Sequence, residues 1–155
     1  MSRPKVVDAL NRLLANQCCS LANYLSDARP WTHPGNEVLV EATRGIVADH
    51  EHYSQRLAEA IEDRDGNVYS GGFPMTFTSL NDLALDYLLV RLVEDQQSNI
   101  QAAEQCMAEL VEDSPAWSLA SEVVGNERAH LDIMKEFLPH AETVPHGDEN
   151  RSCAA

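Results

Sequence analysis

Apolar residues recur every three or four positions through most of this chain, which is the pattern of amphipathic α-helices. The first such stripe lies between Pro4 and Ala28 and includes Val7, Leu10, Leu14, Leu21 and Leu25. Gln17 and Tyr24 fall on the same stripe, so we expect both side chains to face the interior. Two prolines and a glycine between Arg29 and Asn36 predict a loop after this helix.

A second helix is predicted from Glu37 to Asp65, and Gly66 is a suitable residue to end it. Its inward face is predicted to carry Leu39, Ala42, Ile46, His50, Tyr53, Leu57 and Ile61. The next stretch, 67–78, contains Gly71-Gly72 and Pro74, and it is typical of a long irregular connection.

A third helix is predicted to begin after the N-cap candidates of residues 78–82 and to run to about Glu112. Its apolar stripe begins with Leu80, Leu83, Tyr87 and Val90, and the same spacing places Glu94 on the inward face. Asp113-Ser114-Pro115 predicts a tight break, and a fourth helix follows from Ala116 to Leu138.

Two short connections and one long one favour an all-α fold, an antiparallel four-helix bundle with a single long crossover connection. We expect this bundle to occupy residues 1–138 as one domain. Residues 139–155 are polar and lack an apolar period, so they are expected to form a flexible acidic tail.

The formal net charge of −14 argues against a nucleic-acid partner, because an acidic surface repels phosphate backbones. No apolar run approaches the roughly 20 residues of a membrane span, and the N-terminus lacks the apolar core of a signal peptide. The four cysteines form no Cys-x-x-Cys pair, which leaves no zinc knuckle. These features predict a cytoplasmic protein without a membrane partner.

The most specific chemical signal is Glu127 followed three residues later by His130. Residues three apart on a helix project from the same face, so a carboxylate and an imidazole can bind one metal ion there. Glu94 lies one predicted helix earlier and is a candidate third ligand. Alone, the Glu127–His130 pair also fits an exposed pair on an acidic helix.

Longer stretches of the chain resemble the bacterioferritin family. Leu-Asn-Arg-Leu-Leu-Ala-Asn-Gln at 10–17 resembles the first-helix signature of that family, and Tyr24 falls where the family keeps a tyrosine near its metal site. Asn-Glu-Arg-Ala-His-Leu-Asp at 126–132 resembles its acidic Glu-x-x-His segment. The resemblance implies a ferritin-like bundle with iron held by two half-sites. Glu94, Glu127 and His130 match one of these half-sites.

The other half-site departs from the family pattern. Gln17 replaces the first-helix glutamate, and His50 and Tyr53 replace the glutamate and histidine of the second helix. An amide oxygen is a poor substitute for a carboxylate on a hard cation, whereas imidazole is a good ligand for iron or zinc. Glu51 also stands where a family methionine would bind haem, so no haem is predicted.

We therefore expect one metal ion held by His50, Glu94, Glu127 and His130, with Gln17, Tyr24 and Tyr53 around it. Iron is the expected metal, with zinc or manganese as alternatives, and any activity would be at most ferroxidase-like or another oxidoreductase reaction. If the second helix were shifted in register by one residue, Asp49 and His52 would face the site instead. This second half-site could restore a di-iron ferroxidase of an iron-storage protein.

Two further interpretations remain open from the sequence. In one, the bundle is purely structural, and the old site has become a hydrogen-bonded polar network in its core. The other concerns assembly, because bacterioferritins pair before closing a shell. This resemblance implies a homodimer or a larger homo-oligomer.

Overall fold

The structure, a computed structural model, describes residues 2–138 and is all-α, with five α-helices, a short 3₁₀ helix and no strand in that range. The helices are α1 (Arg3–Cys18), α2 (Leu21–Ala28), α3 (Glu37–Glu62), α4 (Leu85–Glu109) and α5 (Ser114–Glu136), and the 3₁₀ helix is η1 (Met75–Leu80). The predicted tail, 139–155, lies outside the described residues. No helix in the described part is long and apolar enough to cross a membrane.

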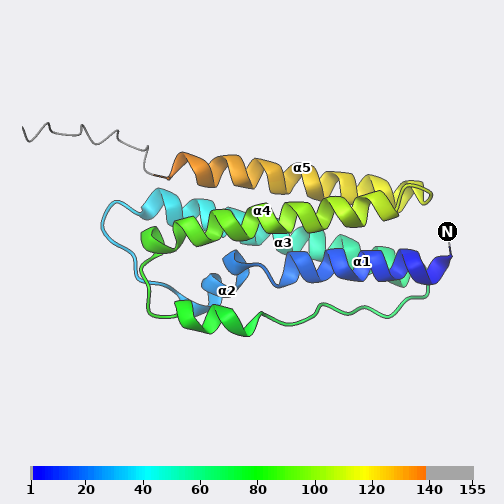
Figure 1. The fold of residues 1–155 in the computed structure, drawn as a ribbon, viewed down its shortest axis with the longest axis horizontal. Coiled ribbons are helices and arrows are strands. Elements are labelled where there is room, and N and C mark those ends of the chain that lie inside the picture. Colours follow the sequence, from blue (N-terminus) through cyan, green and yellow to red (C-terminus); the bar gives the residue numbers. More distant parts are fainter. Residues whose placement is uncertain (1, 139–155) are drawn as a thin grey trace, which may run out of the picture.

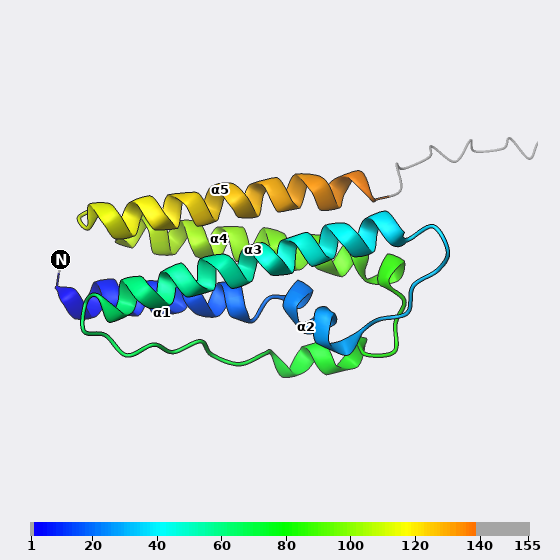
Figure 2. The same ribbon diagram turned by 180° about the vertical axis from the view of Figure 1, so that it is seen from behind.

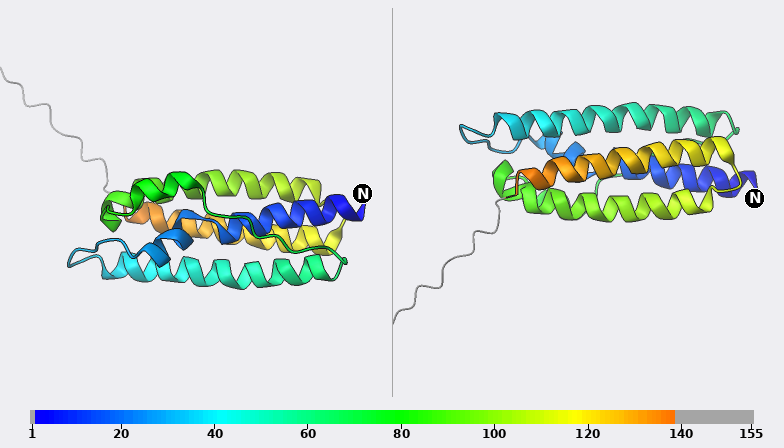
Figure 3. Two further views of the ribbon diagram at one scale, coloured as in Figure 1. Left: turned by 90° about the horizontal axis from the view of Figure 1, so that it is seen from below. Right: turned by 90° about the horizontal axis from the view of Figure 1, so that it is seen from above.

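The four longest helices, α1, α3, α4 and α5, lie side by side along one axis (Figures 1 and 2). α3 and α4 run in the same direction, and α1 and α5 run in the opposite one. The connection from α3 to α4 therefore has to return along the whole length of the molecule, and it passes over α1 (Figure 3). The sequence predicts this long crossover, but it extends to Ala84 and contains η1, so α4 begins at Leu85 and the predicted helix start at 78–82 is wrong.

The first predicted helix is in fact two helices, which is a correction to the sequence analysis. α1 ends at Cys18, and Ser20 caps α2 by accepting a hydrogen bond from the backbone N–H of Asn23 at 3.2 Å. The side chain of Asn23 in turn donates to the carbonyl oxygens of Gln17 and Cys18, at 2.6 and 3.1 Å. These bonds satisfy two free carbonyls at the end of α1 and one free N–H at the start of α2.

Other helix ends follow local sequence signals. Asp113 caps α5 by accepting from the backbone N–H of Ala116 at 3.1 Å, and Arg64 after α3 binds the same carboxylate at 2.8 and 3.0 Å. After α3 the chain turns at Gly66, where a Cβ atom would lie 2.7 Å from a methyl carbon of Val7. Only glycine allows this close approach of the crossover to α1.

The core consists of two apolar clusters at opposite ends of the helices. One is centred on residues such as Leu10, Leu57 and Val123, and the other includes Leu25, Leu88 and Met134. Between them lies a layer of buried polar side chains, namely Gln17, Ser20, His50, Gln96, Glu127 and His130. Burying polar groups is costly unless they are paired, so this layer needs a chemical explanation.

Candidate metal centre

Glu127 is the centre of the polar layer and is the one carboxylate of the described residues that is fully buried. Side chains from all four long helices meet there. Its Oε1 lies 2.7 Å from His50 Nε2 on α3, and Gln17 on α1 donates to the same oxygen at 3.1 Å. Gln96 on α4 donates to Oε2 and, at 2.9 Å, to the backbone oxygen of Glu127.

His130 lies one turn along α5, with its Nδ1 3.8 Å from Glu127 Oε1. Its outer nitrogen, Nε2, lies 2.8 Å from a carboxylate oxygen of Asp49 on α3. A carboxylate can only accept a hydrogen bond here, so we assign a proton to Nε2. In the neutral imidazole the lone pair is then on Nδ1, which has no hydrogen-bond partner although it is buried.

The outer nitrogen of His50, Nδ1, also faces a hydrogen-bond acceptor. Because the side-chain nitrogen of Asn23 donates to two carbonyls, its oxygen is the atom that faces His50 Nδ1 at 3.1 Å. We therefore assign a proton to Nδ1, with the lone pair of the neutral ring on Nε2. Ser20 Oγ lies 3.2 Å from the same Nδ1. The helix break thus supplies both groups that orient His50.

Three acceptors consequently converge inside the protein: His50 Nε2, His130 Nδ1 and a carboxylate oxygen of Glu127. Each of these three buried residues offers one ligand atom such that all three atoms lie within 4.8 Å of one another. Acceptors cannot share hydrogen bonds with one another, so with both rings in these tautomers the arrangement favours a cation between them, either a metal ion or an added proton on an imidazole.

The pKa shifts of Glu127 and His130 also indicate that a positive charge is favoured at this centre. Burial by itself raises the pKa of Glu127, but the two neighbouring imidazoles, His130 and His50, outweigh it, and the pKa is strongly lowered. Burial lowers the pKa of His130, but Glu127 and Asp49 outweigh that effect, and the pKa is raised. Glu127 is therefore ionised, and its negative charge favours a proton or a metal ion beside it.

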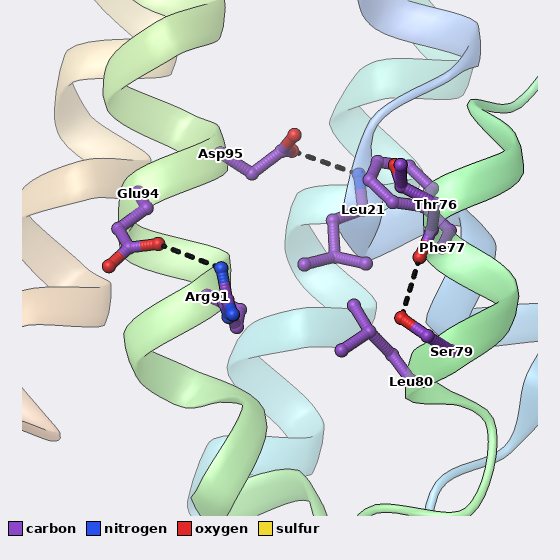
Figure 4. A pocket seen from close by; sticks show the side chains of 8 residues that line it. All are labelled: Leu21, Thr76, Phe77, Ser79, Leu80, Arg91, Glu94 and Asp95. Carbon is purple, nitrogen blue, oxygen red and sulfur yellow. Dashed lines mark hydrogen bonds and ion pairs between the residues drawn. The ribbon is translucent and has the colours of Figure 1, made fainter.

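Glu94 does not join these residues, and its predicted place as a ligand is wrong. Its side chain is 59% exposed and pairs with Arg91 at 3.6 Å on the outer surface of α4 (Figure 4). The predicted stripe is also wrong at Tyr87 and Val90, which are exposed. The inward face of α4 is Leu85, Leu88, Leu89, Leu92, Val93 and Gln96. Gln96 is thus the residue that α4 contributes.

The alternative register of α3 is also wrong in part. His50 is buried and His52 is exposed, so the helix takes the phase that turns His50 inward. Asp49 nevertheless reaches the edge of the site through His130, with its side chain 50% exposed. It orients a candidate ligand from outside instead of pairing with His52.

The two tyrosines expected around the site make their contacts elsewhere. The hydroxyl of Tyr24 donates to Asn81, and its ring packs on Phe73 and Phe77 of the crossover. The ring of Tyr53 packs on His52 and lies under Arg56, and burial raises its pKa, which disfavours a phenolate ligand. Of the predicted surrounding residues, Gln17 alone contacts Glu127.

Sequence reasoning missed Gln96, Asn23, Ser20 and the role of Asp49. The signal for Gln96 was available, because it follows Leu92 and Val93 on one helical face. No sequence signal pointed to Asn23, since its role depends on a helix break within an unbroken apolar stripe.

The comparisons with known proteins identify no relative: no protein-family model matches the chain, and neither the curated proteins nor the solved structures contain a match.

Proposed function

We propose that this protein binds a single divalent metal ion at His50, Glu127 and His130, inside a ferritin-like four-helix bundle. The observation that carries the proposal is the orientation of the two imidazoles. Asn23 and Asp49 each accept from the outer nitrogen, which turns both inner lone pairs toward Glu127. Histidines that bind metals are commonly held in this way by an acceptor behind the ring.

Two imidazoles and one carboxylate suit Fe(II) or Zn(II), and Fe(II) is the ion we propose. The bacterioferritin resemblance at Glu127 and His130 supports iron as the choice. A di-iron ferroxidase would need several carboxylates. At this centre Glu127 is the only buried carboxylate of the described residues, and its neighbours Gln17 and Gln96 are neutral amides. We therefore propose metal binding in place of iron storage, without assigning a catalytic reaction.

A structural bundle without metal is the second candidate function. It is favoured by the direct 2.7 Å contact between His50 Nε2 and Glu127, because a protonated His50 would satisfy the carboxylate without any metal. In that case the polar layer specifies how the helices align, and chelators would not change the melting temperature.

Titration of chelator-treated protein with Fe(II), under anaerobic conditions, and with Zn(II) separates the two candidates. We expect one ion per chain, a rise in melting temperature with added metal, and loss of both effects in Glu127→Gln. Glu136→Gln, which removes an exposed carboxylate of the same helix, is the matched control and should bind as the wild type does. Wild-type protein that takes up no metal, or Glu127→Gln protein that binds normally, would refute the metal site.

The same purified protein tests the expected assembly. We propose a homodimer, on the bacterioferritin resemblance, and light scattering during size-exclusion chromatography distinguishes a 17.2 kDa monomer from a dimer or a large shell.

A further inference from the structure

A second site lies on the surface, where α2, the loop after it, α3 and the start of α4 meet. These elements enclose a half-open pocket of about 360 Å³, which is within the size range of small-molecule sites. Its apolar lining comes from Leu25, Val40, Val47, Leu85 and Pro30. Its polar lining consists of Ser26, Thr32, Thr43, Arg29 and Arg44.

The charge of this pocket is opposite to that of the chain. The protein has 25 acidic and 11 basic residues, yet both charged residues of the described pocket lining are arginines. Pockets elsewhere on the described surface, including the one drawn in Figure 4, carry carboxylates. The other pockets mix basic residues with carboxylates, so an anion is favoured more in this pocket than in the others.

Arg29 also differs from the other arginines of the described residues in having no ion-pair partner. Every other arginine in the described range has a carboxylate within ion-pair distance, whereas Arg29 has none. Arg44 is held by Glu41 at 3.2 Å, but both side chains are more than 70% exposed, so this pair is weak and can be exchanged for a ligand.

The backbone of Arg29 is unusual as well. With φ of +49° it adopts the left-handed conformation at the end of α2, which costs a non-glycine residue free energy. A glycine would take this conformation more readily, and it would not offer a guanidinium at the rim. Such conformations cluster at functional sites, but they are also common at helix ends, and Asp65 after α3 adopts one as well.

We propose that this pocket binds a small organic monoanion with an apolar body, such as a medium-chain or aromatic carboxylate. The apolar body lies on Leu25, Val47 and Leu85, and the carboxylate pairs with Arg29 and Arg44. The hydroxyl of Ser26, which bonds to no other described residue, donates to the same carboxylate. The site is independent of the metal centre, so its test does not depend on metal loading.

The probes are octanoate and benzoate, titrated into the full-length protein and followed by calorimetry and by chemical-shift changes of the Leu25 and Val47 methyl groups. At least one of the two should bind and shift these signals. Arg29→Ala should lower the affinity at least about fivefold, as expected for loss of a charged hydrogen-bond donor, and Arg29→Lys should restore part of it.

Two controls make the result specific. Arg91→Ala removes an arginine from the pocket of Figure 4 and should leave octanoate binding unchanged. Octan-1-ol has a comparable apolar body without the charge and should bind more weakly than octanoate. The proposal is overturned if neither carboxylate binds, if Arg29→Ala binds the carboxylate as the wild type does, or if octan-1-ol binds equally well.

Discussion

Replacing Asp49 by alanine should weaken metal binding while leaving the fold almost unchanged. Asp49 lies 2.8 Å from the outer nitrogen of His130 and keeps the proton there, so that the lone pair on Nδ1 faces Glu127. Without this acceptor the ring can carry its proton on Nδ1 instead. Metal binding then requires a change of tautomer, and the free energy of this change weakens the affinity.

The magnitude follows from the position of Asp49 outside the ligand set. Loss of an acceptor behind a metal-binding histidine typically costs 10- to 100-fold in affinity, or about 1.4–2.7 kcal/mol. The Asp49 side chain is 50% exposed, so solvent screens its pair with His130, and its contribution to the stability of the metal-free protein should be below about 1 kcal/mol. The loss of metal affinity should therefore exceed the loss of stability in the metal-free protein, and the two can be measured separately.

Competition against a chromophoric chelator gives the Zn(II) affinity, and thermal unfolding of chelator-treated protein gives the stability. Glu51→Ala is the control, because it removes an exposed carboxylate two residues along the same helix. A Zn(II) affinity of Asp49→Ala within twofold of the wild type would refute the assigned role of Asp49. An equal loss in Glu51→Ala would show that general surface charge is responsible.

Two other predictions concern stability. The pKa of His130 is raised in the folded protein, so protonation of His130 stabilises the fold. This stabilisation is complete below the unfolded pKa of about 6.5 and is lost as the pH rises through the raised pKa. Denaturant unfolding of chelator-treated protein should therefore show a free energy of unfolding that falls above about pH 6.5, and His130→Gln should reduce this pH dependence. Asp113→Ala removes both the cap of α5 and the partner of Arg64, and it should lower the free energy of unfolding by about 2–3 kcal/mol, whereas a loss below about 0.5 kcal/mol would contradict the capping role.

The sequence predicted the residues of α3 and α5 at the site because their apolar stripes are unambiguous. Ile46, Leu57 and Ile61 determine the phase of α3, and this phase turns His50 inward, as the structure confirms. The spacing of Glu127 and His130 likewise places both on the buried face of α5. In such helices the period of the apolar residues alone is enough to locate a buried polar side chain.

The contribution of α4 could not be predicted in the same way. Leucine and valine occupy both faces at the start of α4, so a stripe could be drawn through Tyr87 and Val90 as readily as through Leu88 and Leu92. Packing against α1 and α5 decides between these faces, and it is not visible in a single sequence. A buried glutamine also attracts less attention than a glutamate, which made Glu94 the more obvious candidate.

The break between α1 and α2 was missed for a related reason. Leu10 and Leu14 before the break and Leu21 and Leu25 after it form one apolar stripe, so the pattern predicts one continuous helix. Ser20 and Asn23 end one helix and start the next through their side chains, and the same side chains orient His50. The local chemistry that breaks the helix is therefore also the chemistry that prepares the proposed site.

Anomalous X-ray diffraction at the zinc or iron edge, from crystals of the metal-loaded protein, would show directly whether a metal ion binds at His50, Glu127 and His130. We expect one anomalous peak per chain, at a metal ion bound by His50 Nε2, Glu127 and His130 Nδ1, with Asp49 and Asn23 still behind the two rings. An empty centre in metal-loaded crystals, two peaks within it, or a single peak bound elsewhere would contradict this expectation.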